Sequence, residues 1–143
     1  MLILLHLLFI SCLLQVCYSD IRYRKIKNSS TIILSLLSLL EGWLYWETVP
    51  LSPAVVVFAA GFLLNACGFI GAGDVKLMAA LSLSLDADNT LLFIFLTTLA
   101  GLPVALVTLL TGRLLRKPAY QTVPYGVAIV GGFVSVVLLR VTV

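Results

Sequence analysis

Residues 53–85 read PAVVVFAAGFLLNACGFIGAGDVKLMAALSLSL, two apolar runs separated by a short segment that carries Asp74 and Lys76. A helix needs about 20 apolar residues to cross a bilayer, and the first of these runs comes close to that length. Ionisable side chains at membrane depth are costly and usually have a function. The stretch therefore predicts two membrane helices, with a carboxylate between them whose position calls for a chemical explanation.

The composition of the whole chain supports a membrane protein. Apolar residues make up 62% of the 143 residues, and the mean hydropathy is +1.17, values typical of an integral membrane protein rather than a soluble domain. The length fits a single domain spanning residues 1–143. The net charge of +3 is too small and too local to indicate nucleic-acid binding. The expected environment is a lipid bilayer.

Six apolar runs are separated by turn-like segments, which predicts an all-α polytopic membrane protein with about six transmembrane helices. The run at residues 75–85 is short for a full crossing, so we expect it to be either tilted or partly shielded by neighbouring helices. Pro124 is well placed to begin the last helix. The runs cover residues 2–18, 32–46, 53–70, 75–85, 91–110 and 124–139.

The basic residues predict the orientation of these helices. Cytoplasmic loops carry an excess of Lys and Arg, and residues 22–27 form such a basic loop directly after the first run. This places the N-terminus outside and the loop inside a cytoplasmic (inner) membrane, and it favours a retained first helix over a signal peptide. Lys76 and the basic segment 113–117 then also lie inside, and only Arg140 lies on the outer side.

The predicted topology brings two carboxylates to one face of the membrane. Asp20 ends the first run and Asp74 opens the fourth, with an even number of crossings between them. Two close carboxylates share a proton, so that one activates water while the other donates to a peptide carbonyl, and the pair gives a bell-shaped pH dependence. Gly71 and Gly73 would allow unusual backbone angles and close approach of an extended substrate. This pattern indicates an intramembrane aspartic protease.

At these residues the chain resembles the type IV prepilin peptidases, also called type IV leader peptidases. Gly71-x-Gly73-Asp74-x-Lys76 matches the GxGDxK signature of that family. Residues 20–28, DIRYRKIKN, look like its first aspartate motif, D-x-R-x-x-x-I-P-N, with Lys27 in place of proline. Residues 124–126, PYG, are similar to the start of its final helix.

The resemblance implies an endopeptidase that cleaves the basic leader from type IV prepilins or pseudopilins, after a glycine and at the cytoplasmic membrane face, for a pilus or secretion assembly system. It implies Asp20 and Asp74 as the catalytic pair, with Gly71, Gly73, Lys76 and Arg22 in supporting or substrate-binding roles. The sequence shows no match to the N-methyltransferase domain of larger members. In this it resembles the short, peptidase-only form that occurs with tight-adherence pilus systems. Archaeal preflagellin peptidases are a related possibility.

No metal or other cofactor is expected. His6 is the single histidine, and Cys12, Cys17 and Cys67 lack metal-ligand spacing, so they are interpreted as small buried hydrophobic residues.

Simpler interpretations stay open beside this one. Taken singly, Asp20 could be an ordinary residue at a helix end, and Asp74 could be an N-cap. Lys76 could be only a topology signal. It follows Asp74 by two residues, so in a regular helix its side chain would point to another face. A small transporter or channel subunit could use the two aspartates as a proton relay, although a relay should distribute acids across the bilayer. A structural assembly subunit would tolerate Asp-to-Asn changes at both positions.

Overall fold

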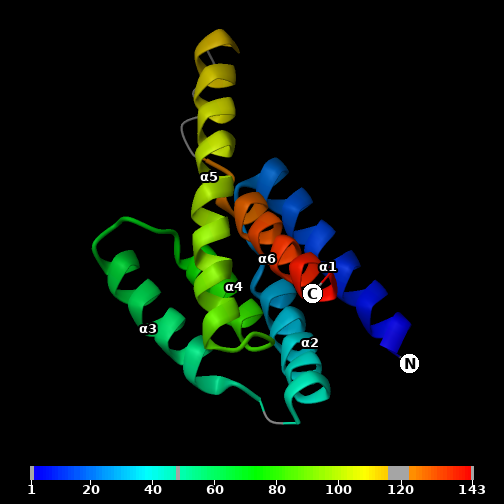
Figure 1. The fold of residues 1–143 in the computed structure, drawn as a ribbon. Coiled ribbons are helices and arrows are strands. Elements are labelled where there is room, and N and C mark those ends of the chain that lie inside the picture. The colour runs from blue at the N-terminus through cyan, green and yellow to red at the C-terminus, as the bar shows by residue number, and fades with distance from the viewer. Residues whose placement is uncertain (1, 48, 116–122, 143) are drawn as a thin grey trace.

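The computed structural model describes residues 2–47, 49–115 and 123–142, and in these ranges it contains six helices and no strand (Figure 1). The predicted all-α fold is therefore confirmed. The helices are α1 (Leu2–Tyr23), α2 (Asn28–Trp46), α3 (Leu51–Ala66), α4 (Ala72–Ser82), α5 (Ala87–Leu115) and α6 (Tyr125–Thr142). The side chains of the basic segment 113–117 lie outside the described residues.

Two helical segments are long and apolar enough to cross a membrane, Leu4–Tyr23 in α1 and Ala87–Leu110 in α5. Helices α3 and α6 contain shorter apolar segments. Large apolar side chains remain exposed along α1, α2, α3, α5 and α6, whereas α4 contributes none. An apolar exterior of this extent is expected for helices that face lipid rather than water.

Helix α4 lies at the centre of the bundle and packs against α2, α3 and α6. Its 11 residues give a length of about 16 Å, which is roughly half of the hydrocarbon core of a bilayer. The predicted shielding of this short segment by its neighbours is confirmed, because side chains on several of its faces are buried. These buried residues are Val75, Leu77, Ala80, Leu81 and Ser82.

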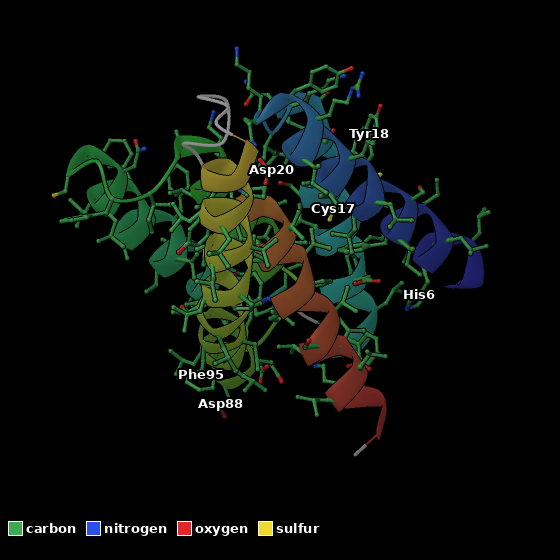
Figure 2. All side chains as sticks on the ribbon, turned by 90° about the horizontal axis from the view of Figure 1, so that it is seen from above. His6, Cys17, Tyr18, Asp20, Asp88 and Phe95 are labelled. Carbon is green, nitrogen blue, oxygen red and sulfur yellow. The ribbon has the colours of Figure 1, made fainter. Side chains whose placement is uncertain are left out.

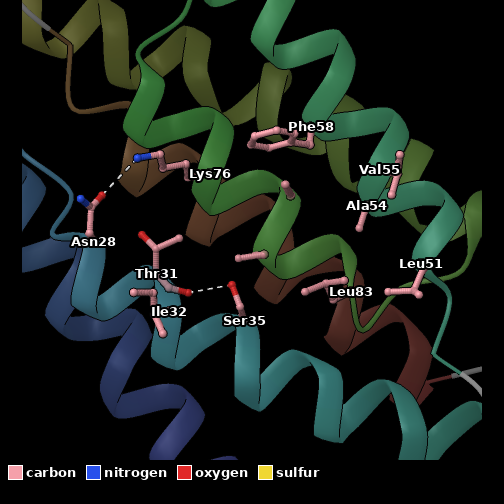
Figure 3. Close-up of a pocket in the computed structure, with 12 residues that line it drawn as sticks. Asn28, Thr31, Ile32, Ser35, Leu51, Ala54, Val55, Phe58, Lys76 and Leu83 are labelled. Carbon is pink, nitrogen blue, oxygen red and sulfur yellow. Dashed lines mark hydrogen bonds between the residues drawn. The ribbon is translucent and has the colours of Figure 1, made fainter.

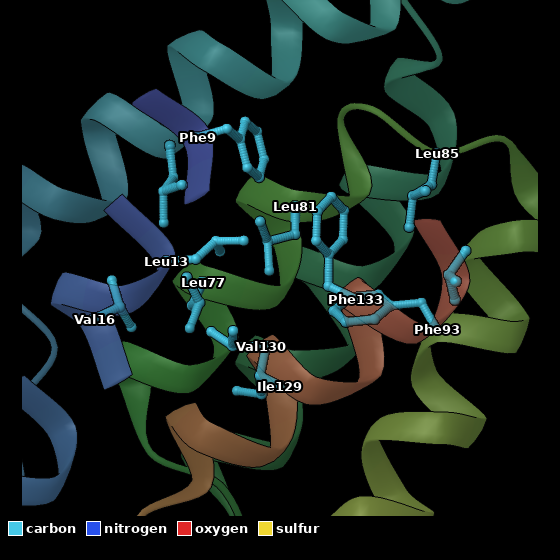
Figure 4. Close-up of a cluster of buried hydrophobic side chains, with 12 residues drawn as sticks. Phe9, Leu13, Val16, Leu77, Leu81, Leu85, Phe93, Ile129, Val130 and Phe133 are labelled. Atoms are coloured by element: carbon cyan, nitrogen blue, oxygen red, sulfur yellow. The ribbon is translucent and has the colours of Figure 1, made fainter. Parts of the chain in front are cut away.

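The hydrophobic core joins α4 to α1, α5 and α6 (Figure 4). Phe133 of α6 lies within it, stacked on Phe9 of α1 with ring centroids 5.4 Å apart. Phe93 of α5 meets the same ring edge-on at 6.0 Å. These aromatic contacts hold three helices that are distant in sequence at fixed positions around α4.

Glycines allow several of these helices to approach closely. A Cβ atom at Gly61 would lie 2.7 Å from Cγ1 of Val75, between α3 and α4. A Cβ atom at Gly132 would overlap Thr97, between α6 and α5. Gly131, the neighbour of Gly132, has no atom within 4 Å of such a Cβ, so the side chain of an alanine fits there without a clash.

Ionisable side chains of α1, α2 and α6 form two pairs. Glu41 of α2 lies 3.7 Å from His6 of α1. Arg140 of α6 lies 4.0 Å from Asp86, and its guanidinium stands 5.5 Å from the centroid of the Tyr45 ring. These contacts stabilise Arg140, the basic residue that the distribution of Lys and Arg placed on the outer side of the membrane.

Candidate active site

Asp20 lies in the last turn of α1, because the helix continues to Tyr23 instead of ending at the aspartate. Its side chain is buried, at 6% exposure, and Figure 2 shows it at the end of the bundle opposite to Asp88. The backbone N–H of Gly126, at the start of α6, donates a hydrogen bond of 2.7 Å to Asp20 Oδ2. Pro124 directly precedes α6, and the Gly126 N–H, which lies in the first turn of that helix and has no acceptor within it, binds the carboxylate.

The turn after Asp20 is held by local hydrogen bonds. Arg24 has a φ of 53°, which is uncommon for a residue with a side chain. Its N–H donates to the backbone oxygen of Asp20 at 3.0 Å, and the Ser19 hydroxyl donates to the backbone oxygen of Lys25 at 2.6 Å. The Arg24 charge also acts on the Asp20 carboxylate. The turn thus fixes Asp20 and supplies a nearby cation.

Asp74 lies in the first turn of α4, and the N-cap of that helix is Gly71. The interpretation of Asp74 as the N-cap is therefore wrong. The Asp74 carboxylate accepts a hydrogen bond from the Gly71 backbone N–H, which is the carboxylate half of a capping box. This bond directs the carboxylate back toward the loop before α4.

The two glycines of the GxGD segment act through their small size. Gly71 has φ −69° and ψ 140°, which any residue adopts, so the expectation of unusual backbone angles is wrong. A Cβ atom at Gly71 would lie 2.9 Å from Asp74 Oδ2. A Cβ atom at Gly73 would lie 3.4 Å from Cβ of Ile26. The absent side chains leave room for the Asp74 carboxylate and for the turn between α1 and α2.

Asp20 and Asp74 are close enough for their charges to interact. Asp74 lies outside the two candidate spans. Burial, and after it the charge of Asp20, raise the pKa of Asp74 to about 6, against the lowering effect of the Gly71 hydrogen bond. A carboxyl group with this pKa holds and releases a proton near neutral pH, which suits acid–base chemistry.

Asp74 opens into a cavity of about 400 Å³ between α3, α4, α5 and α6. The walls are mostly apolar, with Val57 and Leu64 from α3, Ile94 from α5, and Ile129 from α6. Tyr125 also lines this cavity, and the next residue, Gly126, binds Asp20. The start of α6 therefore connects the two carboxylates, and an apolar chain could lie beside them.

Of the predicted site residues, Asp74 and Gly71 line this cavity, and Asp20, Gly73, Lys76 and Arg22 do not. The Lys76 Nζ donates to Oδ1 of Asn28 at 3.3 Å, at the start of α2, and lies on a different face of α4, as its spacing from Asp74 predicted. Arg22 is exposed on the last turn of α1. Sequence reasoning missed two contacts, Gly126 with Asp20 and Asn28 with Lys76, although all four residues belong to the quoted motifs.

Comparisons with known proteins agree with these motifs. Residues 7–106 match the sequence profile of the Type IV leader peptidase family. The chain is 30% identical over 137 residues to the "Prepilin leader peptidase/N-methyltransferase" of Bacillus subtilis (strain 168), covering 87% of this chain and 51% of that protein. It thus spans about half the length of the curated relative it matches. No solved structure matches. From the profile match over most of its length, the chain belongs to the type IV leader peptidase family.

Proposed function

We propose that the chain is an aspartic endopeptidase of the membrane that removes the basic leader peptide from type IV prepilins or pseudopilins. The observation that carries this proposal is the pair of interacting carboxylates, Asp20 and Asp74, beside an apolar cavity. Membership of the family and the similarity to the prepilin leader peptidase of Bacillus subtilis support the same reaction class, peptide-bond hydrolysis.

In the proposed mechanism the two carboxyl groups have different roles. Asp20, whose Oδ2 accepts the Gly126 N–H hydrogen bond, is assigned the role of the base, and in its ionised form it takes a proton from the attacking water. Asp74, with a pKa of about 6, donates to the scissile carbonyl from its protonated form as the tetrahedral intermediate forms. The intermediate then collapses with cleavage of the C–N bond. The leaving amine takes up the proton that Asp20 received, and one hydroxyl of the intermediate returns its proton to Asp74 as the carbonyl of the new carboxyl group forms.

The cavity accounts for the hydrophobic part of the substrate. A prepilin combines a short basic leader with a hydrophobic segment, and the scissile bond lies between them. The apolar wall formed by Val57, Leu64 and Ile94 suits the first side chains of the hydrophobic segment. The basic leader would then extend out of the bundle beyond Asp74.

The experiment is a cleavage assay with purified chain in detergent and candidate prepilins from the same genome, followed by the decrease in prepilin mass. The free enzyme needs protonated Asp74, which loses its proton as the pH rises through about 6. We therefore expect kcat/KM to fall above this pH by about tenfold per pH unit, and to fall again at low pH as Asp20 is protonated. Absence of cleavage at every pH, or a rate that rises steadily from about pH 5 to pH 9, would contradict the proposal.

We further propose that the chain lies in the cytoplasmic membrane as a multi-pass protein, with its N-terminus outside and both aspartates at the cytoplasmic face. The basic residues 22–27 at the Asp20 end support this orientation. In a variant without native cysteines, a cysteine placed at Ser29 should be labelled only after the cells are opened, and one placed at Asn89 should be labelled in intact cells. The reverse pattern would invert the topology.

A further inference from the structure

A second groove lies on the face of α4 that does not carry Asp74 (Figure 3). It has a volume of about 560 Å³ and runs between α2, α3 and α4. Val55 and Phe58 of α3 and Ile32 of α2 line it and are exposed, so the groove is open to the surroundings of the bundle. A long apolar chain could enter it from the side.

The groove has a polar end and an apolar end. Lys76 and Asn28 lie at one end, and Leu51 and Leu83 lie toward the other (Figure 3). Ser35 also lines the groove, but its hydroxyl donates to the Thr31 backbone oxygen at 2.9 Å. The wall beyond Lys76 therefore presents little unsatisfied polar surface, and the groove is amphipathic along its length.

The charge at the polar end favours an anion. The hydrogen-bond partner of Lys76 is the neutral amide of Asn28, and no carboxylate forms an ion pair with Lys76 among the described residues. Lys27, which precedes Asn28, is also exposed. Lys27 does not line the groove, but the Lys76 cation and the Asn28 amide at the end of an apolar channel match the phosphate and acyl chain of an anionic phospholipid.

The peptidase substrate does not fit this groove. Lys76 follows Asp74 by two residues, and on an α-helix this spacing separates the side chains by about 200°. A peptide in the groove would therefore have α4 between its backbone and the Asp74 carboxylate, which faces the other cavity. The positive charge of Lys76 would also repel a basic leader.

We propose that this groove is a binding site for an anionic phospholipid, with the phosphate at Lys76 and Asn28 and one acyl chain along α2, α3 and α4. The lipid holds the start of α2 against α4 at the polar end of the groove. This site is separate from the cavity that Asp74 lines, and the proposal does not depend on the peptidase reaction.

The test is native mass spectrometry of the full chain, released from detergent with equimolar phosphatidylglycerol and phosphatidylethanolamine. The wild-type chain should retain phosphatidylglycerol preferentially. Lys76→Gln should lower that preference about fivefold, the effect of one basic side chain near a lipid surface, whereas Lys76→Arg should preserve most of it. Val55→Trp, which fills the groove, should lower the retention of both lipids.

Matched variants separate this site from general attraction to the basic surface. Lys25→Gln removes the same charge from an exposed residue that does not line the groove, and Thr98→Trp fills the other cavity. Both should retain phosphatidylglycerol like the wild type. Equal losses for Lys76→Gln and Lys25→Gln, no preference in the wild-type chain, or displacement of the lipid by a prepilin peptide would each overturn the proposal. Thermal unfolding of each variant shows whether a loss reflects unfolding. If Lys76→Gln is unfolded, the comparison of Val55→Trp, which should lose the lipid, with Thr98→Trp, which should keep it, decides.

Discussion

Asp20→Asn and Asp74→Asn should each abolish prepilin cleavage, with kcat lowered by about 10²–10⁴-fold or more. An asparagine has nearly the same shape as the aspartate, but it neither takes a proton from water nor donates an acidic one. Because the two carboxyl groups interact and act as a unit, the double variant should be no less active than either single variant within error. The measurement is single-turnover cleavage of a synthetic prepilin by each purified variant.

Asp88→Asn provides the matched control, because Asp88 is exposed and lies at the other end of the bundle (Figure 2). It should cleave at the wild-type rate. Substrate binding by the Asp20 and Asp74 variants should be retained, which distinguishes a chemical defect from an unfolded site. Wild-type cleavage by Asp20→Asn or Asp74→Asn would remove that residue from the mechanism and would favour a structural assembly subunit instead.

The number and order of the helices followed from hydropathy because each helix buries or exposes a long apolar surface. The helix ends were harder to predict. Asp20 was expected to end the first run, but α1 continues to Tyr23, since the carboxylate finds hydrogen-bond donors at Gly126. Asn28 was expected in a turn and instead begins α2. In both cases a polar side chain that is expected to end a helix accepts a hydrogen bond from another helix, from Gly126 of α6 for Asp20 and from Lys76 of α4 for Asn28.

The part of the candidate site that was predictable is the part set by the number of membrane crossings between Asp20 and Asp74. The topology predicted that Asp20 and Asp74 lie at one face of the membrane, and in the structure the charge of Asp20 acts on Asp74. The side-chain partners could not be derived, because they depend on packing between segments far apart in sequence, such as Gly126 against Asp20. The three cysteines were expected to be buried, but Cys12 and Cys17 are only partly buried, and Cys67, which follows the last residue of α3, is exposed.

Gly126→Ala should also lower cleavage strongly, by about 10²-fold in kcat, because a displacement of about 1 Å at a catalytic group can have that effect. A Cβ atom at this position would lie 2.8 Å from Oδ2, 3.1 Å from Cγ and 3.2 Å from Cβ of Asp20. The Asp20 side chain is short, so it cannot move away without losing the Gly126 N–H hydrogen bond. Either the carboxylate turns from Asp74 or α6 moves away from α1.

Gly131→Ala on the same helix is the control, because a Cβ atom there has no neighbour within 4 Å and alanine favours a helix over glycine by about 1 kcal/mol. It should retain full activity and equal or higher thermal stability. Gly126→Ala should lose far more activity than its thermal unfolding in detergent explains, since a strained contact of this kind costs only about 1–3 kcal/mol. If Gly126→Ala kept the wild-type kcat, the position of Asp20 against α6 would not matter for the reaction, and the backbone N–H of Gly126 would have no part in holding the catalytic carboxylate.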